Sequence, residues 1–216
     1  MTQQLSYGAR WRFGLAGFMR RSEQIVDGMV SRYENMTTLD DQDAAEIHQG
    51  MGEDFASKGM WDDAIACFEQ TLERTPDNGA AWCRLGLAQV ASGAFEEALE
   101  SLGRARQAGV DSFELHYGLG DAHGELEQRE QAVNAYQEAL ERKPDMAEAA
   151  YRLGVVLDEL ERYQDAAAAF QRAIRHQPRE ANYHQSLGFT LESMGRRDEA
   201  LRSFKRAINL ERRLRR

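Results

Sequence analysis

The residues of this chain most able to support chemistry are a group of glycines, the histidines and two cysteines. Gly118, Gly120 and Gly124 resemble the glycine fingerprint that holds a pyrophosphate at the start of a helix in dinucleotide-binding folds. Their spacing is one residue longer than that fingerprint requires, and no strand is predicted before them. We therefore expect these glycines to serve helix packing.

The histidines do not form the pattern of a metal site. His48, His116 and His184 recur at one constant, long interval, so each falls in a separate helical unit and is predicted to be structural. His116 and His123 lie two turns apart on one predicted helix, but no carboxylate shares their stripe to complete a ligand set. The sequence predicts no metal ion.

The cysteines and the remaining polar residues do not indicate an enzyme. Cys67 and Cys83 lack the Cys-x-x-Cys spacing of zinc sites and the density of disulfide scaffolds, which favours a reducing compartment and a cytoplasmic location. No nucleophile elbow, paired catalytic carboxylates in a loop, or Cys–His arrangement is found. We expect a non-catalytic protein without a cofactor.

Composition and charge limit the class of partner. Of the 216 residues, 42% are hydrophobic and 29% are charged, and only three are prolines, which favours a helical, soluble protein. The net charge of −9 repels phosphate backbones, so nucleic acid is not an expected partner. Arginines interrupt the apolar residues near the N-terminus, and no apolar stretch is long enough for a membrane span, so neither an export signal nor a transmembrane segment is expected.

A regular repeat organises most of the chain. Five equally spaced glycines show it: Gly52, Gly86, Gly120, Gly154 and Gly188. An alanine follows each glycine at a constant distance, and a large side chain follows each alanine one helical turn later, namely Phe68, Leu102, Tyr136, Phe170 and Phe204. A fixed period of this length is typical of solenoid proteins, in which each unit buries its apolar face against its neighbours.

These positions resemble the tetratricopeptide repeat. The second repeat follows its pattern at Trp82, Leu85, Gly86, Ala98, Leu102 and Ala105. The departures are Gln89 at the second large position and Val110 in place of proline. The resemblance covers residues 45–212 and implies an all-α, right-handed solenoid of helical hairpins that binds proteins. The units are 45–78, 79–112, 113–146, 147–180 and 181–216, the last with a basic C-terminal end.

The repeat predicts its own turns. Gly59, Gly93 and Gly195 fall between the two helices of a unit, where a left-handed cap suits glycine. Glu127 and Glu161 stand at the same point in the third and fourth units, so those turns should be less ideal. Two aspartates that follow prolines are expected to cap the next helices, namely Asp77 and Asp145.

Residues 1–44 follow a different frame. Phe13, Gly17, Met29 and Tyr33 match the large and small sites of a degenerate sixth hairpin if one residue is inserted before Ala45, and a loosely packed lead segment is the alternative. The segment carries an apolar surface that is expected to mediate self-assembly through Trp11, Phe13, Leu15 and Phe18. Contacts between two different surfaces run head to tail and need not close into a ring.

A rotation of 100° per residue identifies the groove that the resemblance implies. Sites 2, 5, 9 and 12, counted from the first residue of each unit, form one stripe along the first helices. Seven of its twenty residues are acidic and none is Lys or Arg. The predicted protein-binding residues are Glu46, Glu53, Glu114, Tyr117, Asp121, Glu148, Tyr151, Asp158, Phe189 and Glu192. This mixture fits a basic, partly apolar peptide, and a merely solvated helical face is the alternative. The basic C-terminal end of another copy is one candidate ligand, and a solvated helix end is the other reading of that segment.

The layout of an irregular N-terminal hairpin before five regular repeats resembles the magnetosome-associated repeat proteins of magnetotactic bacteria, as do the residues around Tyr7, Gly8 and Phe13 and the run from Arg152 to Pro178. That resemblance implies a self-assembling scaffold on the cytosolic face of the magnetosome membrane that recruits other proteins. The alternative is a soluble adaptor or assembly factor that holds a basic client peptide in its groove. An enzyme is the third and weakest hypothesis.

Overall fold

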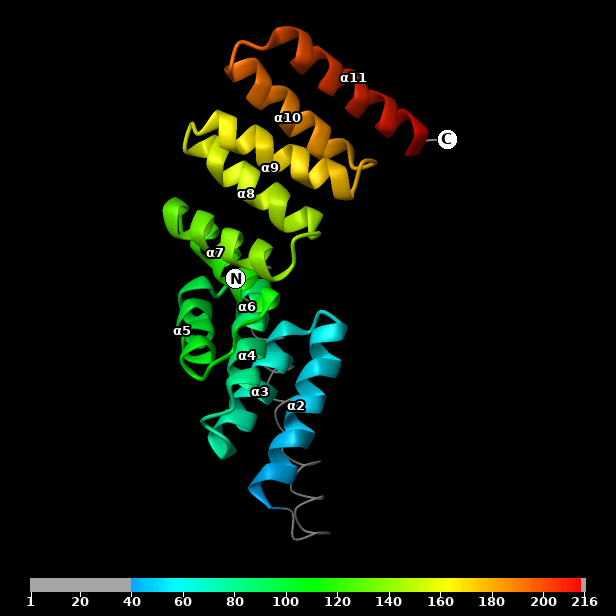
Figure 1. The fold of residues 1–216 in the computed structure, drawn as a ribbon. Coiled ribbons are helices and arrows are strands. Elements are labelled where there is room, and N and C mark those ends of the chain that lie inside the picture. The colour runs from blue at the N-terminus through cyan, green and yellow to red at the C-terminus, as the bar shows by residue number, and fades with distance from the viewer. Residues whose placement is uncertain (1–39, 215–216) are drawn as a thin grey trace, which may run out of the picture.

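The structure is a computed structural model that describes residues 40–214. The described residues form ten helices and no strand (Figure 1). In chain order these are α2 (Asp41–Ser57), α3 (Trp61–Arg74), α4 (Gly79–Ser92), α5 (Phe95–Gln107), α6 (Phe113–Glu125), α7 (Arg129–Arg142), α8 (Ala147–Glu159), α9 (Tyr163–His176), α10 (Ala181–Ser193) and α11 (Arg197–Leu214). The predicted hairpin at residues 1–44 lies outside the described residues, apart from the start of α2.

The helices pair into five antiparallel hairpins, each made of a first helix with an even label and the second helix that follows it. Each helix packs most closely on its partner in the hairpin, and successive hairpins stack along the chain into a curved array (Figure 1). This arrangement confirms the prediction of an all-α solenoid. The first helices α4 and α6 also contact each other, as do α8 and α10, so the two helices of each of these pairs lie side by side in the array.

Within every hairpin the glycine of the first helix lies directly against the large side chain of the second. A Cβ atom added to Gly52, Gly120, Gly154 or Gly188 would lie between 2.5 and 2.7 Å from an aromatic carbon of the facing helix. Real Cβ atoms do not approach that closely, so only glycine admits this helix spacing. Glycine therefore recurs regularly in the sequence because each hairpin needs it at the point where its two helices are in contact.

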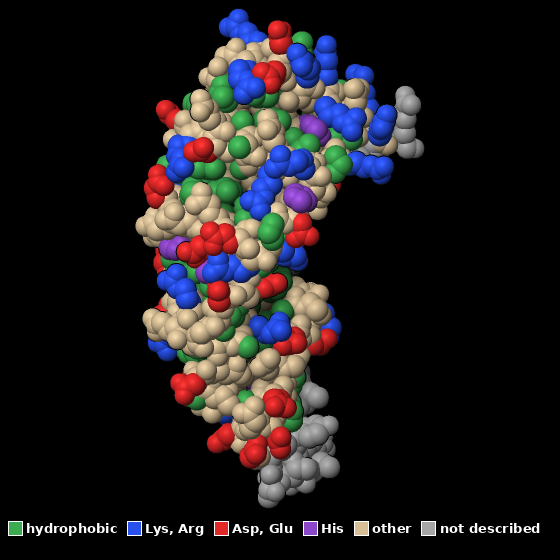
Figure 2. Space-filling model, viewed as in Figure 1, with side chains coloured by type: hydrophobic (Ala, Val, Ile, Leu, Met, Phe, Trp, Pro, Cys, Tyr) green, Lys and Arg blue, Asp and Glu red, His purple; other side chains and the backbone are tan. Residues whose placement is uncertain are grey.

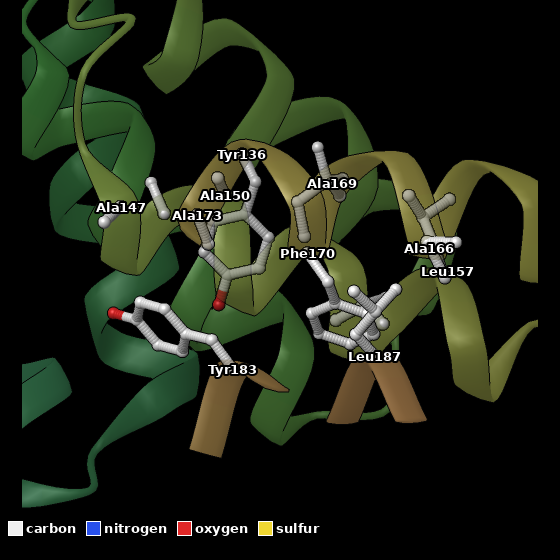
Figure 3. Close-up of a cluster of buried hydrophobic side chains, with 14 of the residues drawn as sticks. Tyr136, Ala147, Ala150, Leu157, Ala166, Ala169, Phe170, Ala173, Tyr183 and Leu187 are labelled. Carbon is white, nitrogen blue, oxygen red and sulfur yellow. The ribbon is translucent and has the colours of Figure 1, made fainter. Parts of the chain in front are cut away.

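The core continues from one hairpin to the next through alternating large and small side chains. One buried cluster runs from α7 to α11, and Figure 3 shows the rings of Tyr136, Phe170 and Tyr183 among alanines such as Ala150 and Ala173. Phe170 is 1% exposed and Ala173 is fully buried. Each ring lies beside alanines, whose small side chains leave room for it, so the helices pack closely.

The turns inside the hairpins follow the sequence prediction. Gly59, Gly93 and Gly195 have positive φ angles of 72°, 88° and 74°. Glu127 and Glu161 adopt the same left-handed backbone conformation, with φ of 57° and 58°. Residues other than glycine rarely adopt this conformation. The two less ideal turns are thus confirmed.

The predicted helix caps after the prolines were wrong. Asn78, not Asp77, caps α4 by accepting a hydrogen bond of 3.0 Å from the backbone N–H of Ala81. The N-cap residue of α8 is Met146, one position after Asp145, and no side chain caps that helix. In both cases the helix begins one residue later than expected, so the aspartate falls outside the cap position.

The close approach in the hairpins gives a prediction for stability. Replacing Gly154 by alanine should push Phe170 away and destabilise the chain by about 1–3 kcal/mol. Gly103 is the matched control, because it lies in α5 with no atom within 4 Å of an added Cβ, and Gly103→Ala should stabilise the helix by about 0.5–1 kcal/mol. Urea midpoints measured by circular dichroism separate the two. Equal midpoints for both variants would show that the contact does not constrain the spacing.

The left-handed glutamates give a second prediction. Replacing Glu127 and Glu161 by glycine should raise stability by about 0.5–1 kcal/mol each, because glycine adopts this conformation without the clash of a Cβ atom. Glu125→Gly is the control, since this exposed residue ends α6 in ordinary helical conformation and its replacement should destabilise. Thermal unfolding measures the differences. A loss of stability in the Glu127 and Glu161 variants would contradict the assignment of strain.

Candidate protein-binding surface

The stripe predicted along the first helices is accessible in the structure. Glu46, Glu114, Phe189 and Glu192 are exposed. The other six predicted residues are half-buried, namely Glu53, Tyr117, Asp121, Glu148, Tyr151 and Asp158. Phe189 is 54% exposed, the highest value among the exposed large hydrophobic residues of the described part. The four self-assembly residues predicted between Trp11 and Phe18 lie outside the described residues.

The aromatic residues of the stripe are supported by other rings. Tyr117 stacks on Phe113 at a centroid distance of 5.5 Å. Tyr151 stacks on Tyr183 of the next hairpin at a centroid distance of 4.8 Å. The exposed Phe189 contacts the ring of Phe204 in α11 at a centroid distance of 5.0 Å. These contacts fix the rings in place before any ligand arrives, which lowers the entropy cost of binding to them.

Three of the central acids are hydrogen-bonded within the array. Asp121 accepts a hydrogen bond of 2.6 Å from the hydroxyl of Tyr136. Glu148 accepts one of 3.0 Å from the hydroxyl of Tyr183, and Asp158 accepts one of 2.6 Å from Thr190, both from the next hairpin. These carboxylates therefore join neighbouring helices as well as lining the surface.

Two arginines form ion pairs with acids of the stripe, and each lies one residue after a stripe position on its own helix. Arg84 forms an ion pair of 2.9 Å with Glu53 of the preceding hairpin, and Arg152 forms one of 3.1 Å with Glu148. Neither ion pair was predicted from the sequence, because both arginines lie outside the stripe positions. For Arg152 a signal was available, since a glutamate four residues before an arginine on a helix predicts such a pair.

In the central part of the stripe, Tyr117, Asp121 and Arg152 affect one another's pKa values. Burial raises the pKa of Asp121, while the hydrogen bond from Tyr136 and the charge of Arg152 act in the opposite direction. Burial, with the negative charge of Asp121 beside it, raises the pKa of Tyr117 to about 12. Asp121 and Arg152 thus partly neutralise each other, and the charge left for a ligand lies at the exposed carboxylates.

The exposed carboxylates of the stripe that have no ion-pair partner in the described part of the chain lie outside the group formed by Tyr117, Asp121 and Arg152. Glu114 and Glu192 are exposed, and neither has an ion-pair partner among residues 40–214. Glu46 is also exposed and accepts only a hydrogen bond of 3.3 Å from Gln42 within the described part of the chain. The surface that remains is acidic, with Phe189 as its apolar contact, and it suits a cationic ligand with an apolar part.

Three further features of the described residues bear on function. They contain no group of three or more His, Cys, Asp or Glu side chains placed to hold a metal ion. None of their helices combines the length and the apolar character needed to cross a bilayer. Cys67 and Cys83 are both buried free thiols, and burial raises the pKa of Cys67 to about 11.

Comparison with known proteins agrees with this architecture. Models of the tetratricopeptide repeat match residues 50–112, 117–183 and 181–213. No curated protein matches the chain. Among solved structures, a crystal structure of MamA is 31% identical, with 76% of this chain and 95% of that chain covered and a TM-score of 0.71.

Two further structures share the fold. MamA from Desulfovibrio magneticus RS-1 is 21% identical, with 78% and 95% of the two chains covered and a TM-score of 0.72. YrrB, a TPR protein with an unusual peptide-binding site, is 24% identical, with 76% and 84% covered and a TM-score of 0.68. The chain belongs to the tetratricopeptide repeat family, and within that family it resembles MamA.

Proposed function

We propose that this protein is a self-assembling scaffold of the MamA type, which holds partner proteins on the stripe of its first helices. Its family supports a protein-interaction scaffold. The observation that carries the proposal is the surface of acids and rings described above, whose side chains are held in place by contacts between neighbouring helices. The likeness to MamA supports placing the assembly on the cytosolic face of a magnetosome membrane.

The partner segment is proposed to be basic and partly apolar. Glu114 and Glu192 offer unpaired negative charge on the hairpins to each side of Tyr151. Phe189 offers an exposed ring in the same region. A ligand of opposite sign gains association rate and specificity from such charges, and an apolar contact at the ring adds affinity.

The last hairpin supplies a segment of this chemistry from the chain itself. Residues 196–216 contain nine Arg or Lys against three acids. Helix α11 also exposes Leu201 and Ile208, at 51% and 47%. An end helix that is both cationic and apolar complements the acidic stripe of another copy, and it adds a second, weaker head-to-tail contact to the main one made by residues 1–44. The competing function, an adaptor for a basic client protein, uses the same stripe without self-association.

The stripe can be tested by reversing its free charges. Glu114→Lys combined with Glu192→Lys should weaken binding of a labelled peptide with the sequence of residues 202–216 at least fivefold and reduce the salt dependence of binding. The double variant Glu96→Lys and Glu141→Lys is the control, because it adds the same charge at exposed positions of second helices. Fluorescence anisotropy measures both. If the two double variants bind equally, the stripe is not the binding surface.

Self-assembly is tested by removing the N-terminal segment. The full chain should elute as large, polydisperse species, and a chain without residues 1–38 should remain helical and become largely monomeric. The deletion stops before Asp40, because that residue caps α2 through the backbone N–H of Asp43 at 2.8 Å. Light scattering after size exclusion gives the masses. A truncated chain that stays equally large would place the contact in the repeats or in the basic end.

A further inference from the structure

A pocket of about 440 Å³ opens between the second helices of the first two hairpins. Its floor is formed by α4 and by apolar side chains, namely Leu72, Pro76, Trp82 and Leu85. Its walls are α3 and α5, so it shares no residue with the stripe on the first helices. The volume falls within the range of ordinary ligand sites.

The walls of the pocket carry an excess of negative charge. Glu69 and Glu73 line it from α3, and Glu97 and Glu100 line it from α5. Glu100 is paired with Arg104 at 2.8 Å, whereas the other three have no ion-pair partner within residues 40–214. Burial and the neighbouring Glu73 raise the pKa of Glu69, as expected for a carboxylate that lacks a compensating cation.

The floor of the pocket contains a buried acceptor without a donor. Gln89 is 8% exposed, and its amide oxygen has no hydrogen-bond partner among the described residues. The equivalent position is apolar in three other repeats, as Phe55, Leu157 and Leu191, and holds His123, which is hydrogen-bonded to Gln128, in the remaining one. An unpaired buried carbonyl costs stability that an apolar side chain would not. Gln89 is therefore unfavourable for folding alone and indicates a ligand that donates hydrogen bonds.

The aromatic residue of the pocket already contacts a guanidinium group. Arg104 lies over the ring of Trp82 at 4.7 Å from its centroid, and the indole N–H of Trp82 donates a 2.8 Å hydrogen bond to the carbonyl of Pro76. The indole is thus held in a fixed orientation. A second hollow of about 460 Å³ adjoins the pocket and shares Pro76, Trp82 and Arg104 with it. This hollow offers space for the residues of a partner that flank the side chain bound in the pocket.

We propose that this pocket binds an arginine side chain presented by a protein partner. A guanidinium group has five N–H donors in a planar fork, which suits carboxylates on two facing helices, and the buried amide oxygen of Gln89 becomes a further acceptor when that amide group turns over toward the pocket. Its methylene groups would cover Leu72 and the edge of Trp82. An ammonium group has three donors on a compact head and matches this spread of acceptors less well.

The experiment compares three short peptides by isothermal titration calorimetry against the full chain. The probe is acetyl-Ala-Ser-Arg-Ser-Ala-amide, and the matched peptides carry citrulline or lysine in place of arginine. The arginine peptide should bind at least tenfold more tightly than the citrulline peptide and measurably more tightly than the lysine peptide. Equal binding of arginine and citrulline overturns the proposal, and equal binding of arginine and lysine overturns the choice of arginine.

Variants of the chain locate the binding. Glu69→Gln with Glu73→Gln should weaken binding of the arginine peptide about tenfold, while Glu96→Gln with Glu141→Gln should leave it unchanged. Glu114→Lys with Glu192→Lys should also leave it unchanged, so failure of the pocket and failure of the stripe are distinguishable. If only the stripe variant weakens binding, the pocket is not the site.

Gln89 provides the sharpest variant, because its two effects should have opposite signs. Gln89→Leu restores the side chain found in two other repeats and should raise the unfolding temperature, yet it should weaken arginine binding about tenfold. A purely structural role for Gln89 would change stability without changing the preference for arginine over citrulline. Unchanged binding in this variant would contradict the role assigned to the amide oxygen.

Discussion

The contact between a glycine of the first helix and the large side chain of the second determines the rest of this structure. In every hairpin an aromatic ring or Leu102 occupies the space where a Cβ would otherwise be, so the helices approach to a fixed distance. Because the contact recurs at a constant interval along the chain, every hairpin closes in the same way and then packs on the next one. The hairpins therefore follow one another along a curved array (Figure 1).

That regular frame separates two proposed binding surfaces, the stripe on the first helices and the pocket between α3 and α5. The first helices carry acids and rings that are tied across hairpins, as in the bond from Tyr183 to Glu148. Figure 2 shows charged side chains of both signs spread over the visible face of the array, with Lys and Arg concentrated near the C-terminal end. A scaffold with separate faces can hold more than one partner without changing its own fold.

Departures from the repeat pattern have different consequences. Glu127 and Glu161 accept backbone strain at a turn, yet the turn still forms because the flanking helices are held by their core contacts. Gln89 departs from the pattern in the core itself and leaves an acceptor unpaired. The first kind of departure affects stability alone, whereas the second lies in a pocket and bears on function.

The sequence by itself determined the hairpins, their period, the left-handed turns and the acidic stripe, because each depends on spacing within one or two adjacent helices. Tertiary structure decided which stripe residues are free. Arg84 forms an ion pair with Glu53, and Thr190 donates a hydrogen bond to Asp158, and both contacts join side chains of different hairpins. Such pairs depend on how neighbouring hairpins cross and on side-chain rotamers, which no helical periodicity records. The pocket above Trp82 likewise exists only where α3, α4 and α5 meet.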